Sequence, residues 1–300
     1  MTLLRPPVLL LLLTLPATAR PDEASPVAVG AKIEKLADGF QFTEGPAADA
    51  KGNIYFTDQP NDRILKWSTD GKLSTFMEPA GRSNGLCFGP DGRLWACADE
   101  KNELWTIDVA TKKHTVAVKD YKGKLLNGPN DVWVRPDGGV YFTDPFYKRS
   151  YWKRGPIEQD QQAVYYLTPD GKTLARVADD LKQPNGIIGT PDGKTLYVAD
   201  IGANKSFRYS IDEDGTLADK KPFCDQGSDG MTIDEKGNVY LTGKGVQIYD
   251  KAGKKVAQID VPEGWTANVC FGGSDMKTLF ITASTKLYGL KMNVKGAGSQ

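Results

Sequence analysis

The sequence has one histidine, no net charge, no C-x-x-C pair and no apolar run of membrane-spanning length. With His114 alone, neither a histidine-based catalytic triad nor a histidine-rich zinc site can be assembled. This residue lies among charged neighbours, so we expect it at the surface. Lys plus Arg and Asp plus Glu number 38 each, so the overall charge gives no reason to expect a nucleic-acid or anionic-membrane partner.

Helical periodicity is also missing. No segment of useful length shows the 3.6-residue apolar repeat of an amphipathic helix, and no Pro/Ser-rich linker divides the chain of 300 residues. We therefore expect an all-β protein with a single domain over residues 20–300.

Four cysteines are present, at Cys87, Cys97, Cys224 and Cys270. Four cysteines allow three complete pairings, and the sequence does not choose among them. Cys87 and Cys270 lie in similar apolar stretches, which favours small buried side chains at these two positions.

The first residues have the order of a secretory signal. Arg5 supplies a positive charge, an apolar run extends from Val8 to Leu15, and Ala17 and Ala19 form an A-x-A pair. The run is far shorter than the ~20 residues needed to span a bilayer. We predict a signal peptide over residues 1–19 and export to the periplasm or the extracellular space, with no membrane association after cleavage. An uncleaved anchor is the alternative.

A short motif recurs six times along the rest of the chain. Each copy is a turn followed by β-branched or aromatic residues, as at 50–58. Five copies keep a turn glycine, which accepts a positive φ without steric cost, and the sixth, at 274–282, has lost it. The turn glycines are Gly52, Gly92, Gly138, Gly193 and Gly237, at steps of 40, 46, 55 and 44 residues.

Six units of roughly 45 residues, each rich in short strands, predict a six-bladed β-propeller with four-stranded blades. The last unit contains only three strand candidates, ending near Leu290. Residues 32–37, ahead of the first unit, can supply the fourth strand beside residues 268–291. Such a strand would close the ring and remove an exposed edge.

One polar residue opens the first strand of every unit. These residues follow the repeat, at steps of 40, 46, 55, 44 and 39, and they are Glu44, Asn84, Asn130, Asn185, Asp229 and Asn268. Because the first strand of a propeller blade lines the central channel, we expect the six side chains to form a ring at one channel mouth. Two carboxylates in that ring would repel each other, and a divalent cation would neutralise both.

All six side chains carry oxygen donors, which hard cations such as Ca²⁺ and Mg²⁺ prefer. The ring therefore predicts one divalent cation, with Ca²⁺ as the first candidate and Mg²⁺, Mn²⁺ or Zn²⁺ as alternatives. Asn-Gly and Asp-Gly pairs also mark turns by themselves, so a purely structural role is the competing interpretation for any one residue of the ring.

The loops that return to this face are mostly short. The third is long, and the first ten residues of its span, 145–162, carry four aromatic and four basic side chains. Long loops in compact domains are often binding lids, and this composition suits a polar, hydroxylated or anionic small molecule. A solvated surface loop is the alternative.

The strand openings, taken together, resemble the senescence marker protein/gluconolactonase/luciferin-regenerating-enzyme-like propellers, over nearly all of the chain after residue 19. The segments that carry the resemblance are Phe42-Thr43-Glu44-Gly45-Pro46, Asn127-Gly128-Pro129-Asn130-Asp131-Val132, Gln183-Pro184-Asn185-Gly186 and Gly227-Ser228-Asp229-Gly230-Met231. The resemblance implies that Glu44, Asn185 and Asp229 hold a divalent cation. It also implies that Asn130 contacts substrate or completes the metal shell.

The same resemblance implies a reaction. Many members hydrolyse sugar lactones such as gluconolactone, and Asp229 corresponds to their proposed proton donor or acceptor. Some members place an arginine two residues before the third-blade asparagine, where it binds the sugar, but this chain has Gly128 there. That departure weakens the case for any one aldonolactone.

We therefore expect a lactonase in which a metal polarises the lactone carbonyl, Asp229 transfers a proton, and Asn130 and Asn84 orient a small-molecule substrate. A metal-dependent esterase or phosphotriesterase on the same scaffold is one alternative. A non-catalytic propeller that binds a ligand and keeps a structural Ca²⁺ is the other, because a fold does not decide function.

Overall fold

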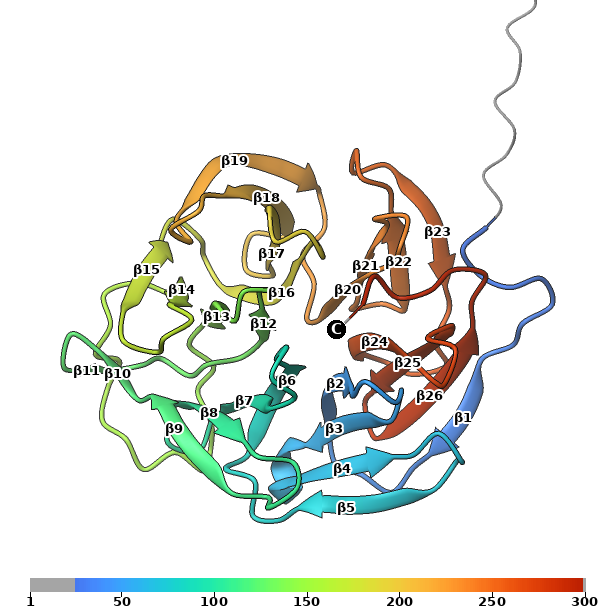
Figure 1. Ribbon diagram of the computed structural model, residues 1–300, viewed down its shortest axis with the longest axis horizontal. Coiled ribbons are helices and arrows are strands. Elements are labelled where there is room, and N and C mark those ends of the chain that lie inside the picture. Colours follow the sequence, from blue (N-terminus) through green and yellow to red (C-terminus); the bar gives the residue numbers. More distant parts are fainter. Residues whose placement is uncertain (1–24, 299–300) are drawn as a thin grey trace, which may run out of the picture.

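The runs of β-branched and aromatic residues form strands, and the glycine turns between them close antiparallel hairpins. The computed structural model describes residues 25–298 and arranges them as six four-stranded sheets around a central axis (Figure 1). The all-β, six-bladed propeller predicted from the repeat is thereby confirmed. One short 3₁₀ turn, η1 (Gln59–Asn61), is the only helical element in this part of the chain.

Each of the first five blades adds its strands in chain order from the axis outward (Figure 1). The first two blades contain β2 (Thr43–Ala48), β3 (Ile54–Asp58), β4 (Arg63–Trp67), β5 (Leu73–Met77), and then β6 (Ser83–Phe88), β7 (Leu94–Ala98), β8 (Glu103–Ile107), β9 (His114–Val118). The third and fourth contain β12 (Val132–Val134), β13 (Val140–Asp144), β14 (Ala163–Leu167), β15 (Leu174–Ala178), and then β16 (Pro184–Gly189), β17 (Thr195–Asp200), β18 (Lys205–Ile211), β19 (Leu217–Cys224).

The remaining strands complete the ring. The fifth blade contains β20 (Met231–Ile233), β21 (Val239–Leu241), β22 (Val246–Tyr249) and β23 (Lys255–Ile259). The sixth contains β24 (Thr266–Gly272), β25 (Thr278–Ala283), β26 (Lys286–Lys291) and, outermost, β1 (Glu34–Ala37). A small hairpin of β10 (Asp120–Tyr121) and β11 (Lys124–Leu125) lies between the second and third blades.

The outermost strand of the last blade comes from the start of the described chain. β1 pairs antiparallel with β26, with Glu34 opposite Gly289 and Lys35 opposite Tyr288. Leu36 packs on the bare backbone of Gly289, where an added Cβ would lie 3.0 Å from Leu36 Cδ1. This pairing confirms the predicted closure, and it covers an edge of β26 that would otherwise be free to pair with another chain.

Threonine side chains on or directly after the second strands fix neighbouring blades to one another. The hydroxyls of Thr57, Thr143 and Thr242 donate to the main-chain carbonyls of Asn84, Asn185 and Ala267 in the next blade, at 3.1, 2.8 and 2.8 Å. Each acceptor belongs to the opening of a first strand. These bonds therefore set the height at which the polar residues of adjacent blades lie along the axis.

Aspartates that end second strands hold the same openings from within their own blades. Asp58, Asp144 and Asp200 each accept two backbone N–H groups from the segment that leads into the first strand of their blade, at 2.7–3.2 Å. Buried backbone donors need such partners, because an unsatisfied N–H costs free energy. The threonine and aspartate side chains at the ends of the second strands therefore position the channel mouth.

The single histidine and the four cysteines have no catalytic setting. His114 is exposed, as expected, and stacks on Trp105 with 3.8 Å between ring centroids. All four cysteines are free, and burial raises the pKa of Cys87 to about 12. Cys270 is buried as expected, whereas Cys87 is half-buried.

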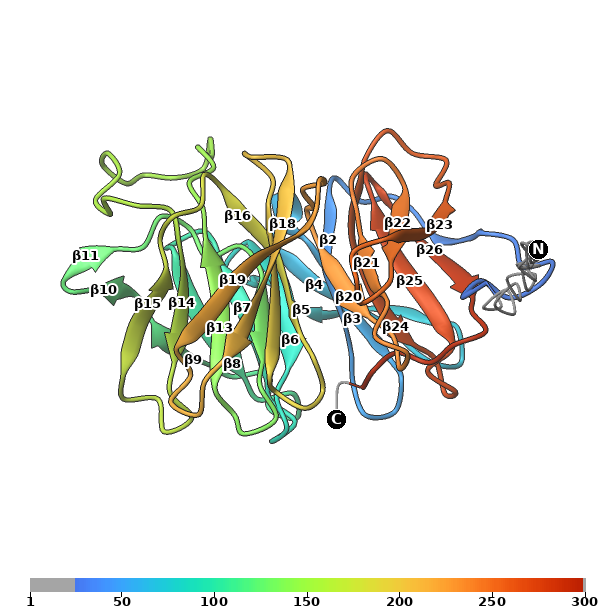
Figure 2. The same ribbon diagram turned by 90° about the horizontal axis from the view of Figure 1, so that it is seen from above.

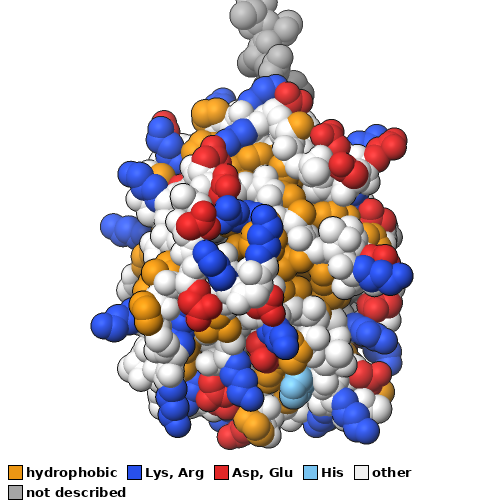
Figure 3. Space-filling model, turned by 90° about the vertical axis from the view of Figure 1, so that its left-hand side faces the viewer, with side chains coloured by type: hydrophobic (Ala, Val, Ile, Leu, Met, Phe, Trp, Pro, Cys, Tyr) orange, Lys and Arg blue, Asp and Glu red, His pale blue; other side chains and the backbone are white. Residues whose placement is uncertain are grey.

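Figure 3 shows acidic and basic side chains interspersed over the flank of the second and third blades.

The predicted signal peptide, residues 1–19, and its boundary lie outside the described residues. Between residues 25 and 298, no helix has the length and apolar character needed to cross a membrane.

Replacing Leu36 by alanine is expected to lower the free energy of unfolding by about 2 kcal/mol, because the side chain packs between the outer strands of the closing sheet. Leu73→Ala is the matched control, since Leu73 also lies on an outer strand but is 41% exposed. The control should cost less than about 0.5 kcal/mol. Urea unfolding followed by tryptophan fluorescence measures both, and equal losses would contradict closure through β1.

Candidate functional site

The six polar residues that open the first strands meet at one mouth of the central channel, where Asn185 forms a hydrogen bond with Asp229 and the charge of Asp229 reaches Glu44. Five of them are at most 5% exposed, and these are Glu44, Asn84, Asn130, Asn185 and Asn268. Asp229 is partly exposed at the rim. The predicted ring is therefore present as an arrangement in space, and its two acidic members come from the first and fifth blades.

Glu44 and Asp229 lie close enough to influence each other's ionisation. Burial, and then the negative charge of Asp229, raise the pKa of Glu44 well above its ordinary value. Burial also raises the pKa of Asp229. Neither carboxylate forms an ion pair with any residue between 25 and 298, although the backbone N–H of Gly45 donates to Glu44 Oε2 at 2.9 Å. The pair is an acidic site without a protein counter-charge in contact.

Two side-chain donors orient the carboxylate of Asp229. Asn185 Nδ2 donates to Asp229 Oδ1 at 2.9 Å, and the indole Nε1 of Trp265 donates to Asp229 Oδ2 at 2.6 Å. Trp265 is 39% exposed, so its ring forms part of the open rim. The sequence did not indicate Trp265, because it lies in an irregular loop outside the repeated motif.

The side-chain amide of Asn185 has one atom without a hydrogen-bond partner among the described residues. Its nitrogen donates to Asp229 and, at 2.8 Å, to the hydroxyl of Tyr147, while its oxygen Oδ1 is buried without a hydrogen-bond partner. The side-chain amides of Asn84 and Asn130 also form no hydrogen bond to the described residues. Unsatisfied amide oxygens beside two acidic groups fit a divalent cation that takes oxygen ligands.

No cluster of three or more His, Cys, Asp or Glu side chains suited to a metal is found among residues 25–298. A cation at the channel mouth would therefore depend on the amide oxygens as much as on the two carboxylates. That donor set favours a hard cation over one that prefers nitrogen or sulfur.

A third carboxyl, Asp131, lies deeper in the channel and was not predicted as a site residue. It is 6% exposed, and burial raises its pKa to about 8. In four other units a glycine follows the ring residue, as Gly85 follows Asn84. A Cβ at Gly85 would lie 2.5 Å from Asp131 Oδ1, so the glycine leaves room for this acid. The break in the glycine pattern at Asn130-Asp131 was the available signal.

Beyond Asp131 the channel becomes largely apolar. Its walls include Leu86, Val132, Ile187 and Val269, which surround a cavity of about 140 Å³. Residues 296–298 lie at the far mouth, on the opposite side of the propeller from the loop 145–162 (Figure 2). The polar groups suited to chemistry are therefore concentrated at one end.

Residues 81–85 have the G-x-S-x-G spacing of a hydrolase nucleophile turn, but the structure excludes that role for Ser83. The residue begins strand β6 instead of occupying a strand-to-helix turn. It is 1% exposed, and its hydroxyl donates to the carbonyl of Ala80 at 2.6 Å. The one histidine, His114, lies on the outermost strand of that blade and cannot act as its base.

The long loop, residues 145–162, reaches the channel mouth, and we call it the lid. Two of its four basic side chains are already bound to other parts of the protein. Arg149 Nε donates to Asp99 Oδ2 at 2.9 Å, and Arg154 Nη1 donates to the carbonyls of Leu126 and Asn127 at 2.8 and 2.7 Å. These guanidinium groups stabilise the lid, so composition alone misjudged their availability to a ligand.

The lid also explains the glycine at position 128. A Cβ there would lie 2.8 Å from Asp99 Oδ1 and 3.0 Å from Trp152 Cζ2. An arginine at this position would therefore collide with the lid, whose Trp152 takes up the space. The absence of a side chain at position 128 therefore leaves the space that Trp152 of the lid occupies.

Comparison with known proteins supports a relationship over most of the chain. The family model for the SMP-30/Gluconolactonase/LRE-like region matches residues 42–285. A gluconolactonase of Zymomonas mobilis is 32% identical over 89% of this chain and 83% of its own length. The solved structure of a gluconolactonase from Xanthomonas campestris has a TM-score of 0.83 and 31% identity, covering 89% of this chain and 91% of that one.

A more distant structure shares the fold alone. Regucalcin from Agrobacterium tumefaciens, described as a calcium-binding protein, has a TM-score of 0.75 at 22% identity, covering 89% of this chain and 95% of its own. The family match extends over the blades that supply Glu44, Asn130, Asn185 and Asp229. This chain belongs to the SMP-30/gluconolactonase/LRE-like family.

Proposed function

We propose that this protein hydrolyses sugar lactones and that one divalent cation, held by Glu44, Asn185, Asp229 and Asn130, assists the reaction. The observation that carries the proposal is the acidic pair Glu44 and Asp229 beside the unpartnered oxygen of Asn185. Relatives named gluconolactonase at 31% and 32% identity support the substrate class.

When bound, the cation would supply a positive charge that polarises the lactone carbonyl and offsets the two carboxylates. Ca²⁺ is the first candidate because every donor in the set is an oxygen. Mg²⁺, Mn²⁺ and Zn²⁺ are the alternatives.

Asp229 is the residue we assign to proton transfer. Its two oxygens are fixed by Asn185 and Trp265, so the carboxylate has a set orientation at the rim. It can take a proton from the attacking water and later give one to the leaving ring oxygen. Asn130 and Asn84 have side-chain amides without protein partners, which suits them to orient the hydroxyl groups of a sugar lactone.

Export forms part of the proposal. The signal-like segment 1–19 would direct the protein to the periplasm or the extracellular space. The catalytic alternatives are an esterase or phosphotriesterase using the same groups, and the non-catalytic alternative is a ligand-binding propeller with a structural Ca²⁺.

The first measurement is acid release from a panel of aldonolactones by the mature protein. We expect hydrolysis that disappears on chelation and returns with one added metal among Ca²⁺, Mg²⁺, Mn²⁺ and Zn²⁺. Simple esters and phosphotriesters belong in the same panel. Turnover of those compounds without any lactone turnover would favour the alternative enzymes, and no turnover at all would favour the binding propeller.

Cation binding can be tested without substrate. In chelated protein, Glu44→Gln is expected to raise the melting temperature, because burial and the charge of Asp229 disfavour the ionised form of Glu44 and glutamine removes that cost. Added Ca²⁺ at about 100 times its Kd should stabilise the wild type by about 2.7 kcal/mol and leave the variant almost unaffected. Glu213→Gln, at an exposed turn, is the control. Equal Ca²⁺ responses in all three proteins would place the cation elsewhere.

Asp229→Asn keeps the shape of the side chain and removes its charge and basicity. Lactone turnover should fall at least ~100-fold, the lower end of the effect of a positioned acid–base group. Asp225→Asn, four residues earlier and exposed, should retain wild-type turnover. A variant at 229 that still hydrolyses lactones at the wild-type rate would remove Asp229 from the mechanism.

A further inference from the structure

Asp99 occupies the same position in its unit as Asp58, Asp144 and Asp200, but its contacts are different. The other three accept backbone N–H groups from the opening of their own blade. The opening of the second blade is held instead by Asp62 of the first blade, which accepts the N–H groups of Ala80 and Arg82 at 3.0 and 2.6 Å. The carboxylate of Asp99 is thereby released for other partners.

Those partners come mainly from the lid. Asp99 Oδ2 accepts Arg149 Nε at 2.9 Å and the Tyr151 hydroxyl at 2.5 Å, as well as Gln59 Nε2 at 3.2 Å. The main-chain carbonyl of Asp99 accepts the indole N–H of Trp152 at 2.7 Å. These three contacts, from Arg149, Tyr151 and Trp152, fix the middle of the lid to the second blade.

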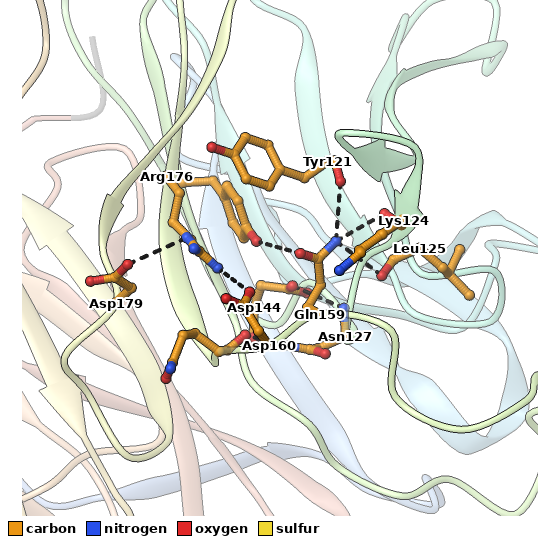
Figure 4. A network of polar contacts seen from close by, with 11 residues as sticks. Tyr121, Lys124, Leu125, Asn127, Asp144, Gln159, Asp160, Arg176 and Asp179 are labelled. Atoms are coloured by element: carbon orange, nitrogen blue, oxygen red, sulfur yellow. Dashed lines mark hydrogen bonds and ion pairs between the residues drawn. The ribbon is translucent and has the colours of Figure 1, made fainter.

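The end of the lid is held separately, on the side of the third blade (Figure 4). Gln159 Nε2 donates to the carbonyls of Tyr121, Lys124 and Leu125, at 3.4, 2.9 and 3.3 Å. Arg176 forms an ion pair with Asp160 at 2.6 Å. With both anchors in place, a loop of irregular backbone has one preferred position over the channel mouth.

Tyr147 lies in the lid ahead of these anchors and reaches the ring. Its hydroxyl oxygen accepts the side-chain N–H of Asn185 at 2.8 Å. The guanidinium carbon of Arg149 lies 5.2 Å from the centre of the Tyr147 ring, so the residue held by Asp99 packs directly on the tyrosine. A phenol that accepts one hydrogen bond still has its O–H to donate.

We propose that Tyr147 is a substrate-positioning residue that donates a hydrogen bond to a hydroxyl or carbonyl oxygen of the lactone, and that Asp99 is the residue that holds the lid in the position presenting it. The ligand in this proposal rests on the proposed lactonase function, whereas the role of Asp99 in fixing the lid does not. Asp99 acts through Arg149 and Tyr151 and touches no substrate.

The substrate role is tested with Tyr147→Phe, which removes only the hydroxyl. For an aldonolactone we expect KM to rise about fivefold with kcat little changed, since one hydrogen bond contributes about 1 kcal/mol. A lactone that lacks ring hydroxyls should show a smaller rise if Tyr147 donates to a hydroxyl, and the same rise if it donates to the lactone carbonyl. Tyr121→Phe is the matched control, because the Tyr121 hydroxyl forms no hydrogen bond to residues 25–298. Wild-type KM values for both lactones in Tyr147→Phe would overturn the role of Tyr147.

The anchor is tested without substrate by limited proteolysis. Lys148, Arg149, Lys153 and Arg154 are trypsin sites within the lid. In Asp99→Asn we expect trypsin to cut between residues 145 and 162 at least ten times faster than in the wild type, while Asp225→Asn is cut at the wild-type rate. Tyr151→Phe removes one bond to Asp99 and no charge, so it should show a smaller acceleration even if Asp99→Asn folds poorly.

The double variant Asp99→Asn/Tyr147→Phe links the two tests. If Asp99 acts on substrate through Tyr147, the KM of the double variant should be close to the higher of the two single-variant KM values. A KM rise equal to the product of the two single-variant rises would overturn the link. Lack of lactone hydrolysis by the wild type would refute the lactone ligand together with the proposed function. The trypsin result would still decide the anchor, and unchanged cleavage in Asp99→Asn and Tyr151→Phe would overturn it.

Discussion

The proximity of two acidic side chains, Glu44 and Asp229, is the constraint around which this face of the propeller is built. They belong to the first and fifth blades, so only the closed ring brings them together. The surrounding groups are donors and amides: Gly45 N–H on Glu44, and Asn185 and Trp265 on Asp229. Two acidic groups held close together without a basic side chain in contact form an arrangement that a positive ligand can stabilise, and this is the physical basis of the function we propose.

The parts that could be predicted from the sequence were those that recur. Turn glycines and strand openings repeat in each unit, so six blades, the closing strand and the ring followed from spacing alone. Asp131 could have been identified in the same way, because it occupies the position at which four other units have a glycine. Tyr147 and Trp265 were not, because each contacts the ring from an irregular loop, 38 and 36 residues away from its partner along the chain. No periodicity marks such residues.

The number of charged residues in a segment was the least reliable basis for predicting a ligand-binding surface. The basic residues of the lid suggested a surface open to an anion, yet Arg149 and Arg154 are used to bind Asp99 and two main-chain carbonyls. Composition states how many charges a segment has and not where their partners lie. In the same way, four aspartates at one position of the repeat look equivalent in sequence, and only the contacts of Asp62 show why Asp99 differs.

The seam between β1 and β26 has a consequence for the order in which the molecule can form. The two strands come from opposite ends of the described chain, so the sixth sheet cannot be completed until nearly every residue has been synthesised. The first five blades can assemble beforehand, but the ring remains open, with the loop-closure entropy still to be overcome. Since the opposed carboxylates belong to blades on either side of that seam, the channel mouth reaches its final shape last. A chain released early would have most of its strands and no finished site.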